Sequence, residues 1–359
     1  MSGLSSDMEK GGAHIASVAV AAPLFSISQT QSGECLLKHY AGKLSPRSLT
    51  LARKLFSHPS IQERHFAIAD PESFFMEDPD QRIHRFTESS IELSSRAITE
   101  ALNDAGLSKD DVRGLVVNTC TGYICPGIST YLIERLGLKR NTRAYDLVGS
   151  GCGGAIPNLE VAASLLNSFS DGVVISVSVE ICSATFQAGD DLSLLVSNTL
   201  FGDGAAAAVL WKRPEGLQLM SSASSYVPEY RDAIRYVHKG GQLYNQLSTN
   251  LPHLVKHAVR KVVEDVTEAR SLELDDIHHW ALHTGGEKII NTIRDEIGLP
   301  EGRLEATRRV LSEYGNMSSP TVWFVLNEIL SKGIKKGEWG IMIAFGAGLS
   351  AHALLLRRA

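Results

Sequence analysis

The sequence lacks the excess of basic residues that is expected of a protein that binds nucleic acid or an anionic membrane surface. Its 359 residues include 35 Lys and Arg against 40 Asp and Glu, a formal net charge of -5, and no local basic patch is evident. Long apolar runs are also missing. The longest, such as 204–211 and 341–349, fall well short of the ~20 residues that a membrane-spanning helix requires. We therefore expect no nucleic-acid partner and no membrane span.

Cysteine is infrequent, and its spacing forms no metal-binding pattern. The five cysteines are an odd number and include no Cys-x-x-Cys pair, which argues against a disulfide framework and against a thiolate zinc site. The first residues lack the basic and apolar segments of a secretory signal, and residues 1–12 are polar enough to form a loose terminus. We therefore expect a cytoplasmic protein in which at least one thiol is free.

Apolar residues make up 43% of the sequence, which is enough for a large core, and their spacing alternates between strand-like and helix-like segments. Strands are expected at 15–22, 112–119, 143–148, 172–179 and 340–345, and helices at 87–105, 128–136, 155–167 and 318–330. Alternation of this kind predicts an α/β fold, in which helices cover the faces of a sheet.

The second part of the chain repeats the pattern of the first. The segment 110–119 recurs as 275–284, and Gly151-Cys152 with its following helix recurs as Gly315-Asn316 with its own helix. Because the spacing between the copies is nearly constant, a duplicated unit is the simplest explanation. We predict two pseudo-repeated βαβαβ halves, residues 1–215 and 216–359, that share one core.

This repeat places three polar side chains at equivalent ends of its elements. Cys152 and Asn316 each follow a glycine where the chain turns into a helix, and His283 ends a second-half strand just before two glycines. If the halves pack about a pseudo-twofold axis, these ends converge. We therefore expect Cys152, His283 and Asn316 to share one site.

A thiol, an imidazole and a carboxamide together can catalyse carbon–carbon bond formation. A thiol at a helix N-terminus beside an imidazole readily forms a thiolate, which attacks a thioester carbonyl while backbone N–H groups stabilise the oxyanion. The imidazole and the carboxamide can both donate hydrogen bonds to the enolate that a malonyl thioester forms as it loses carbon dioxide. The trio is therefore typical of decarboxylative Claisen condensation, which needs no metal.

Four segments resemble the type III polyketide synthases, the chalcone synthase-like enzymes of the thiolase fold. They are Gly151-Cys152, Leu200-Phe-Gly-Asp-Gly-Ala-Ala-Ala207, His283-Thr-Gly-Gly286 and Tyr314-Gly-Asn-Met-Ser-Ser319, and the resemblance spans nearly the whole chain. It implies a thiolase-like fold with layers in the order α-β-α-β-α. It also implies that Cys152 carries the starter and the growing chain, while His283 and Asn316 promote decarboxylation.

The same resemblance implies further site residues and the substrates. Phe201 corresponds to the gatekeeper aromatic between the CoA tunnel and the cavity, and the cavity lining would include Cys120, Thr185 and Ser318. Cys125 falls on the loop that reaches toward the partner subunit, so a homodimer is implied. The substrates would be an acyl-CoA and malonyl-CoA, and no cofactor is expected.

Several positions depart from the family pattern. Gly153 follows the nucleophile where plant members carry a bulky side chain, and Ala347 stands where the family usually has proline. The second gatekeeper is either Tyr244 or Asn245, and Gln62 occupies one expected lysine position of the CoA phosphate site. The starter, the number of extensions and the product are therefore left open.

Three other interpretations compete with this one. Gly149-Ser-Gly-Cys-Gly-Gly154 matches G-x-G-x-x-G after a strand, as in an NAD-dependent Rossmann oxidoreductase. An initiating ketoacyl-carrier-protein synthase shares the fold and the trio but takes its extender from a carrier protein. A non-catalytic scaffold would normally have lost part of the trio.

His253 and His257 share a helix face without a third ligand, so no metal site is expected.

Overall fold

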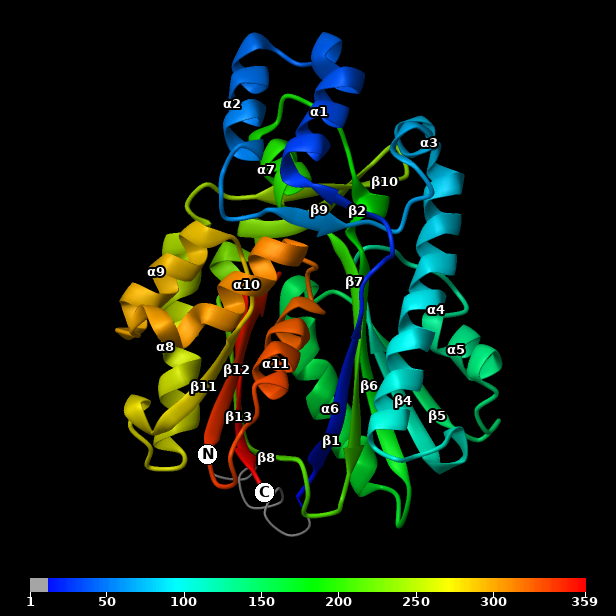
Figure 1. Cartoon of the computed structure of the whole chain (residues 1–359), viewed down its shortest axis with the longest axis vertical. Coiled ribbons are helices and arrows are strands. Elements are labelled where there is room, and N and C mark those ends of the chain that lie inside the picture. The colour runs from blue at the N-terminus through cyan, green and yellow to red at the C-terminus, as the bar shows by residue number, and fades with distance from the viewer. Residues whose placement is uncertain (1–11) are drawn as a thin grey trace.

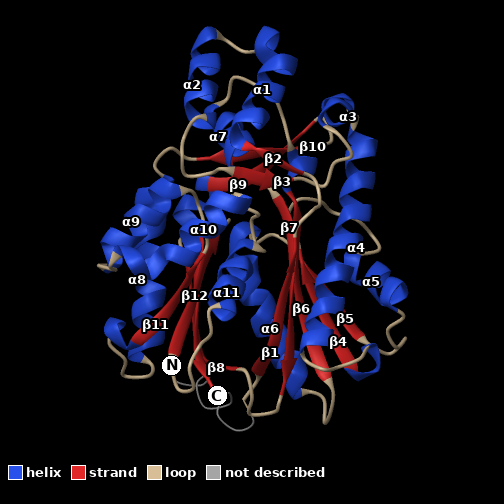
Figure 2. Ribbon diagram, viewed as in Figure 1, coloured by secondary structure: helices blue, strands red, loops and turns tan. Residues whose placement is uncertain are grey.

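The computed structural model describes residues 12–359, so the prediction for residues 1–12 lies outside the described part of the chain except at Gly12. Within it, one mixed sheet of nine strands has the order β11-β12-β13-β8-β1-β7-β6-β4-β5 (Figures 1 and 2). These strands are β1 (His14–Ala21), β4 (Val112–Asn118), β5 (Arg143–Leu147), β6 (Val173–Ile181), β7 (Asp203–Trp211), β8 (Leu217–Tyr226), β11 (Ile277–Leu282), β12 (Trp339–Gly346) and β13 (Ser350–Arg358). The α/β prediction is confirmed.

The sheet consists of two arms that meet at a narrow junction. β1 and β8 pair only through His14 with Gln218 and Ile15 with Leu217, and beyond these pairs the arms diverge (Figure 1). One arm is β5-β4-β6-β7-β1 and the other is β8-β13-β12-β11. In each arm the first strand of the repeat, β4 or β11, is parallel to its neighbour, β6 or β12. The arms therefore correspond to the two copies of the repeat.

The second arm differs from the prediction by one strand. The segment that corresponds to β5 forms helix α10 (Glu305–Tyr314) instead. Among its buried residues, Val310 and Leu311 lie four and five positions after Ala306. This is helical spacing, whereas a strand would bury every second residue. Within residues 12–359 the second copy therefore keeps the βαβαβ order through β8, α8 (Leu251–Glu268), β11, α9 (Glu287–Ile297) and β12 but has no equivalent of β5.

Helices occupy the space between the arms and the outer faces of both. The central pair is α6 (Ala155–Asn167) and α11 (Thr321–Ser331), and the outer helices are α4 (Pro79–Asp104), α5 (Ile128–Leu136), α8 (Leu251–Glu268) and α9 (Glu287–Ile297). Both central helices contact strands of both arms, so they are apolar around most of their circumference. The layers follow the order α-β-α-β-α (Figure 2), as expected for a thiolase-like fold.

Two helices begin at residues that differ from those predicted by their apolar spacing. α4 starts at Pro79 because Asp78 caps its N-terminus and forms a capping box with Gln81. α11 starts at Thr321, three residues later than predicted, because Ser318 has a left-handed φ of 60° that no α-helix can include. Local capping and backbone conformation therefore decide both boundaries.

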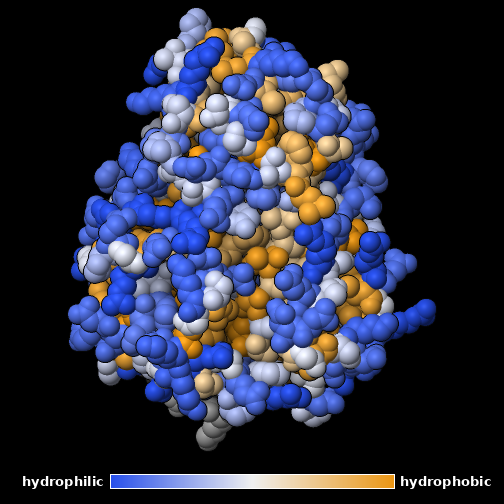
Figure 3. Space-filling model, in the orientation of Figure 1, coloured by the Kyte–Doolittle hydropathy of each residue, from blue (hydrophilic) through white to orange (hydrophobic). Residues whose placement is uncertain are grey.

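A cap of smaller elements covers one end of the two arms (Figure 1). It contains β2 (Ser26–Ser28), α1 (Gln29–Tyr40), α2 (Pro46–Phe56), β3 (Glu63–His65), α3 (Pro71–Met76), α7 (Leu192–Leu200) and the hairpin of β9 (Ile234–Lys239) and β10 (Gln242–Leu247). The surface over the outer helices is mostly hydrophilic in Figure 3. No helix in the described part of the chain is long and apolar enough to span a membrane.

Candidate active site

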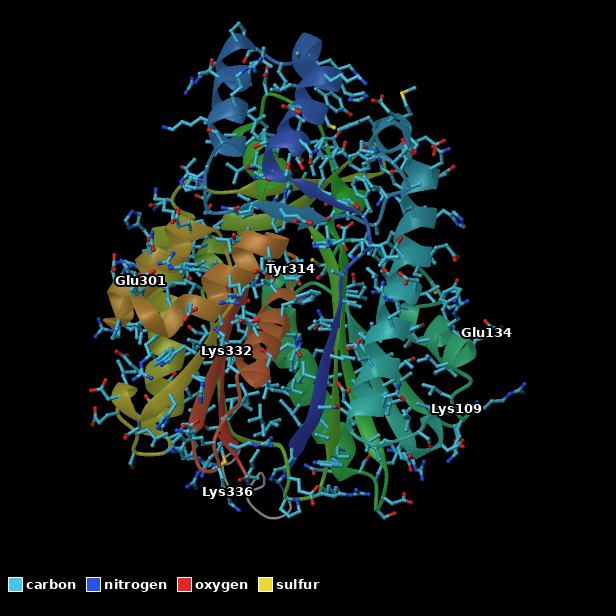
Figure 4. All side chains as sticks on the ribbon, viewed as in Figure 1. Lys109, Glu134, Glu301, Tyr314, Lys332 and Lys336 are labelled. Atoms are coloured by element: carbon cyan, nitrogen blue, oxygen red, sulfur yellow. The ribbon has the colours of Figure 1, made fainter. Side chains whose placement is uncertain are left out.

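Residues from both halves line one cavity of about 760 Å³ beneath the cap. Of the predicted site residues, its walls include Cys152, His283, Asn316, Phe201, Cys120 and Ser318. Tyr314, at the start of the second-half motif, lies near the centre of the view in Figure 4, whereas Glu134, Glu301 and Lys336 lie toward the periphery. The thiol, the imidazole and the carboxamide thus reach the same cavity from opposite halves of the chain.

Cys152 lies in a short 3-10 turn, Gly151–Gly154, between β5 and α6. Gly151 has a φ of 55°, in the left-handed region that glycine adopts without strain. Gly346, at the end of β12, packs directly on this turn, because a Cβ at position 346 would lie 2.4 Å from the nitrogen of Gly153 and 3.1 Å from that of Cys152. The second half therefore holds the backbone of the nucleophile's turn.

The structure accounts for the glycine that follows the nucleophile. A Cβ at Gly153 would lie 3.2 Å from Cδ2 of His352 and 3.3 Å from Oγ of Ser350. His352 is fully buried in β13, and its Nδ1 forms a 2.8 Å hydrogen bond with Oγ of Ser224. His352 therefore occupies the space that a bulky side chain at position 153 would need.

His283 follows β11 and is fully buried. Its backbone N–H donates to the carbonyl of Ile343 at 2.8 Å, and its ring meets the Phe345 ring edge-on with 5.0 Å between centroids. Neither ring nitrogen has a hydrogen-bond partner among the described residues. Because buried polar atoms are almost always hydrogen-bonded, these two nitrogens are positioned to bind a ligand in the cavity.

Backbone hydrogen bonds join Asn316 to the segment that carries Phe201. The Asn316 N–H donates to the carbonyl of Leu200, and its carbonyl accepts from the N–H of Gly202, both at 2.9 Å. Its side-chain Oδ1 accepts the Ser318 N–H at 2.7 Å. The amide nitrogen is thus the group that Asn316 can offer to a substrate. The N-cap position of α11 is Pro320, so Asn316 does not cap that helix.

Desolvation shifts the ionisation of both Cys152 and His283. Burial raises the pKa of Cys152 to about 12, although a hydrogen bond with Ser318 partly opposes this shift. Burial also lowers the pKa of His283 to about 3. Both side chains are neutral near pH 7, because desolvation disfavours an isolated charge on either. A thiolate at Cys152 therefore requires a compensating positive charge within the same cavity.

Glu180, in β6, would be the acidic residue of the Rossmann alternative, and the sequence did not place it beside Cys120 and Ser319. Its buried carboxylate accepts backbone N–H groups of Cys120 at 2.9 Å and Thr121 at 3.1 Å, and the Ser319 hydroxyl at 2.9 Å. Burial raises the pKa of Glu180, and these hydrogen bonds oppose the shift. Through these hydrogen bonds, Glu180 connects the loop after β4 in the first half to the turn at Ser319 in the second half. The sequence feature that could have identified Glu180 is an acidic residue within an otherwise mostly apolar strand.

The predicted substrate-contacting residues separate into two groups. Cys120 and Ser318 line the cavity together, with 3.6 Å between Sγ and Oγ. Thr185 instead lines a neighbouring apolar pocket of about 70 Å³, and its Oγ1 lies 3.4 Å from the hydroxyl of Tyr236, which lines the cavity. Cys125 is exposed and precedes a cis Pro126, away from the cavity wall of its own chain.

The structure distinguishes between the two candidates for the second gatekeeper. Asn245 lines the catalytic cavity, as Phe201 does, whereas Tyr244 does not. In an antiparallel hairpin, neighbouring residues point to opposite faces, which accounts for the difference. Position 245 is therefore the one that can contact a substrate.

The glycine-rich fingerprint is used for packing and not for a pyrophosphate. A Cβ at Gly154 would lie 2.8 Å from Nδ2 of Asn118, and Gly151 and Gly153 face Ala347 and His352. The glycines therefore allow the turn around Cys152 to approach both halves. In the described part of the chain, no group of three or more His, Cys, Asp or Glu side chains could hold a metal ion.

Comparisons with known proteins identify relatives along the whole chain. A family model described as FAE1/Type III polyketide synthase-like protein matches residues 27–224, and one described as chalcone and stilbene synthases, C-terminal domain, matches residues 218–359. The 3,5-dihydroxyphenylacetyl-CoA synthase of Streptomyces toyocaensis is 30% identical over 85% of this chain and 82% of its own. The 1,3,6,8-tetrahydroxynaphthalene synthase of Streptomyces peucetius subsp. caesius is 27% identical over 96% and 93%.

Solved structures have the same fold. The C-terminal type III polyketide synthase domain of Steely1 from Dictyostelium aligns with a TM-score of 0.89 at 24% identity, over 96% of this chain and 99% of that one. PKS-I from the brown alga Ectocarpus siliculosus aligns with a TM-score of 0.87 at 26% identity, over 97% and 98%. These matches support a condensing acyltransferase and not the Rossmann oxidoreductase or the carrier-protein synthase. The chain belongs to the type III polyketide synthase family.

Proposed function

We propose that this protein condenses an acyl-CoA starter with malonyl-CoA, using Cys152, His283 and Asn316. The observation that carries the proposal is that a thiol, an imidazole and a carboxamide from two halves of the chain line one cavity. Both imidazole nitrogens lack protein partners among the described residues, which supports a role in binding substrate atoms.

In the loading step, the sulfur of Cys152 attacks the starter thioester and displaces CoA. The thiol proton moves to His283 as the sulfur attacks and then to the departing CoA sulfur, so that neither buried group carries a lone charge. The pKa values of about 12 for Cys152 and about 3 for His283 support this coupling, because each opposes ionisation on its own. We assign the Cys152 backbone N–H as a donor to the oxyanion.

In the condensation step, malonyl-CoA loses carbon dioxide and leaves an enolate of acetyl-CoA. Neutral His283 and the amide nitrogen of Asn316 donate hydrogen bonds to the enolate oxygen. The enolate carbon attacks the thioester carbonyl on Cys152, a carbon–carbon bond forms, and the carbon–sulfur bond breaks. The product is a CoA thioester two carbons longer than the starter. The electron pair of the broken bond leaves on the cysteine sulfur, which takes up a proton from water and returns to the neutral thiol.

The proposal extends to the surroundings of the trio. Phe201, Cys120 and Ser318 would contact the acyl chain directly, and Thr185 would act through the hydroxyl of Tyr236. No cofactor is needed besides the CoA thioesters, because loss of carbon dioxide drives bond formation. The cytoplasmic location stays a prediction from the sequence.

We also propose that the protein is a homodimer, with Cys125 directed toward the partner subunit. β5 is an edge strand that pairs only with β4 in the main sheet. Tyr145 in β5 and Val148 just after it are 47% and 58% exposed. An edge strand with exposed apolar side chains is a surface that proteins normally cover, and a second copy of the chain would cover it.

Replacing two of the three residues tests the proposal. Cys152→Ala should abolish both the acyl-enzyme and the product, as followed by mass spectrometry of protein and products with a panel of acyl-CoA starters and malonyl-CoA. Asn316→Ala should still form the acyl-enzyme but release carbon dioxide about a hundredfold or more slowly. Cys35→Ala serves as a matched control. Undiminished product from Cys152→Ala would refute the assignment, and an acylation defect alone in Asn316→Ala would refute its enolate role.

A further inference from the structure

Two arginines that the proposed reaction does not use line the catalytic cavity. Arg82 lies in the first turn of α4, and Arg235 lies in the β9–β10 hairpin. No Asp or Glu belongs to the residues that line this cavity in the described part of the chain. Neither arginine therefore has a carboxylate partner among the residues that line the cavity.

Arg235 is already paired, and Arg82 is not. Arg235 donates to Asp232 and to Oε1 of Gln246, the latter at 3.2 Å. Arg82 donates one Nη1 hydrogen bond to the carbonyl of Phe186, while its buried Nε has no hydrogen-bond partner and its guanidinium forms no ion pair within residues 12–359. Burial lowers the pKa of Arg82, and the charge of nearby Glu77 partly opposes this shift.

Arg85, in the same helix, provides a comparison because protein groups accept hydrogen bonds from all three of its guanidinium nitrogens. Arg85 lies one turn further along α4 and is absent from the cavity wall. Its Nε and Nη2 donate to Glu77 at 2.7 and 2.8 Å, and its Nη1 donates to the Ser183 hydroxyl and to the carbonyl of Ala67. Both carboxylate oxygens of Glu77 therefore accept hydrogen bonds from Arg85. Arg82 lines the cavity without an ion pair among the described residues, and a half-buried charge gains from a partner of opposite sign.

We propose that Arg82 binds a carboxylate at the far end of the acyl chain, and that the starters of this enzyme include short dicarboxylic acids linked to CoA through one carboxyl group. This inference rests on the proposed function. Each round of condensation inserts two carbons next to Cys152, so the starter's far end moves away from the sulfur. A carboxylate accepts the fork of donors that a guanidinium presents better than any neutral group of its size does.

Matched pairs of starters measure this recognition directly. We would determine kcat/KM for succinyl-, glutaryl- and adipyl-CoA against butyryl-, pentanoyl- and hexanoyl-CoA, each with malonyl-CoA, in the wild-type enzyme and in Arg82→Met. The wild type should prefer at least one dicarboxylic starter over its neutral partner. In Arg82→Met this preference should fall about tenfold to a hundredfold, the effect expected for loss of a hydrogen bond to a charged group, with little change for neutral starters.

Two further variants separate recognition from a structural role. Arg82→Lys keeps the charge and should retain part of the preference. Arg96→Met changes an exposed arginine of the same helix, paired only with Glu92, and should leave the preference unchanged. If Arg82→Met lowers activity equally for dicarboxylic and neutral starters, or if the wild type shows no preference, the inference is wrong. Failure of the wild type to condense any starter would instead refute the proposed function.

Discussion

Among single residues, desolvation governs the titratable side chains around the cavity. It raises the pKa of Cys152 to about 12 and lowers the pKa values of His283 and His352 to about 3 and about 4. Each of these groups is neutral at pH 7 in the folded protein. For the reaction, this means that charge develops only when a proton moves between groups. For stability, it means that the folded state resists protonation of its buried imidazoles.

Replacing His352 should therefore reduce the protein's sensitivity to acid. Because its folded pKa is lowered below the unfolded value of 6.5, its contribution to stability is complete above pH 6.5 and is lost as the pH falls toward 4. At pH 5, 1.5 units below the unfolded value, the loss is about 2 kcal/mol. Between pH 7.5 and pH 5, we expect the free energy of unfolding to fall by about 2 kcal/mol less in His352→Gln than in the wild type.

Denaturant unfolding of wild type and variant at both pH values measures this difference. The comparison uses the change with pH and not the absolute stability, since losing the hydrogen bond with Ser224 also costs stability at both values. His84→Gln, a change at an exposed histidine, is the matched control and should keep the wild-type acid sensitivity. An unaltered pH dependence in His352→Gln would contradict the argument.

Among structural elements, the site depends on segments of one half that hold segments of the other. Gly346 at the end of β12 presses on the turn that carries Cys152. Glu180 in β6 holds the loop after β4 and the turn at Ser319. Asn316 shares a backbone bridge with Phe201. Each contact joins residues that are far apart in sequence, so the geometry of the trio depends on how closely the two arms approach.

Enlarging Gly346 should disturb the nucleophile without touching it. A Cβ there would lie 2.4 Å from the nitrogen of Gly153 and 2.6 Å from the carbonyl oxygen of Ser150, so the turn at Cys152 must shift. We expect Gly346→Ala to lower kcat/KM roughly a hundredfold, since a displacement of about 1 Å can have that effect. Gly302→Ala, with no atom within 4 Å of its Cβ position, should retain wild-type activity. Equal activity in both variants would exclude the proposed role of this contact.

For the whole molecule, the exposed edge of the sheet is the feature that the single chain leaves incomplete. If two copies join along β5, size-exclusion chromatography with light scattering should give about twice the 38.9 kDa of one chain. Tyr145→Lys places a charge on this edge and should shift the mass toward that of the monomer, because a charged edge strand resists pairing. Tyr230→Lys, a change at a tyrosine of similar exposure, should leave the mass unchanged. A monomeric wild type would refute the dimer.

Much of the molecule followed from the sequence. Helices α5 and α6 begin and end where their apolar spacing predicts, and the duplicated pattern predicts that Cys152, His283 and Asn316 face one cavity. Residue type and spacing carry these predictions because they depend on local periodicity and on the symmetry of the repeat. The replacement of a second β5 by α10 was missed, since the repeat pattern outweighed the local helical spacing of Ala306, Val310 and Leu311.

The sequence by itself determined the α/β layers, the family motifs and the identities of the three candidate catalytic side chains. Only the tertiary structure decided that Thr185 lies behind Tyr236, that Glu180 connects the two halves, and that burial shifts the pKa values of Cys152 and His283 toward their neutral forms. The physical reason is that burial and desolvation arise from the packing of segments far apart in sequence, and no local pattern encodes how much water that packing excludes.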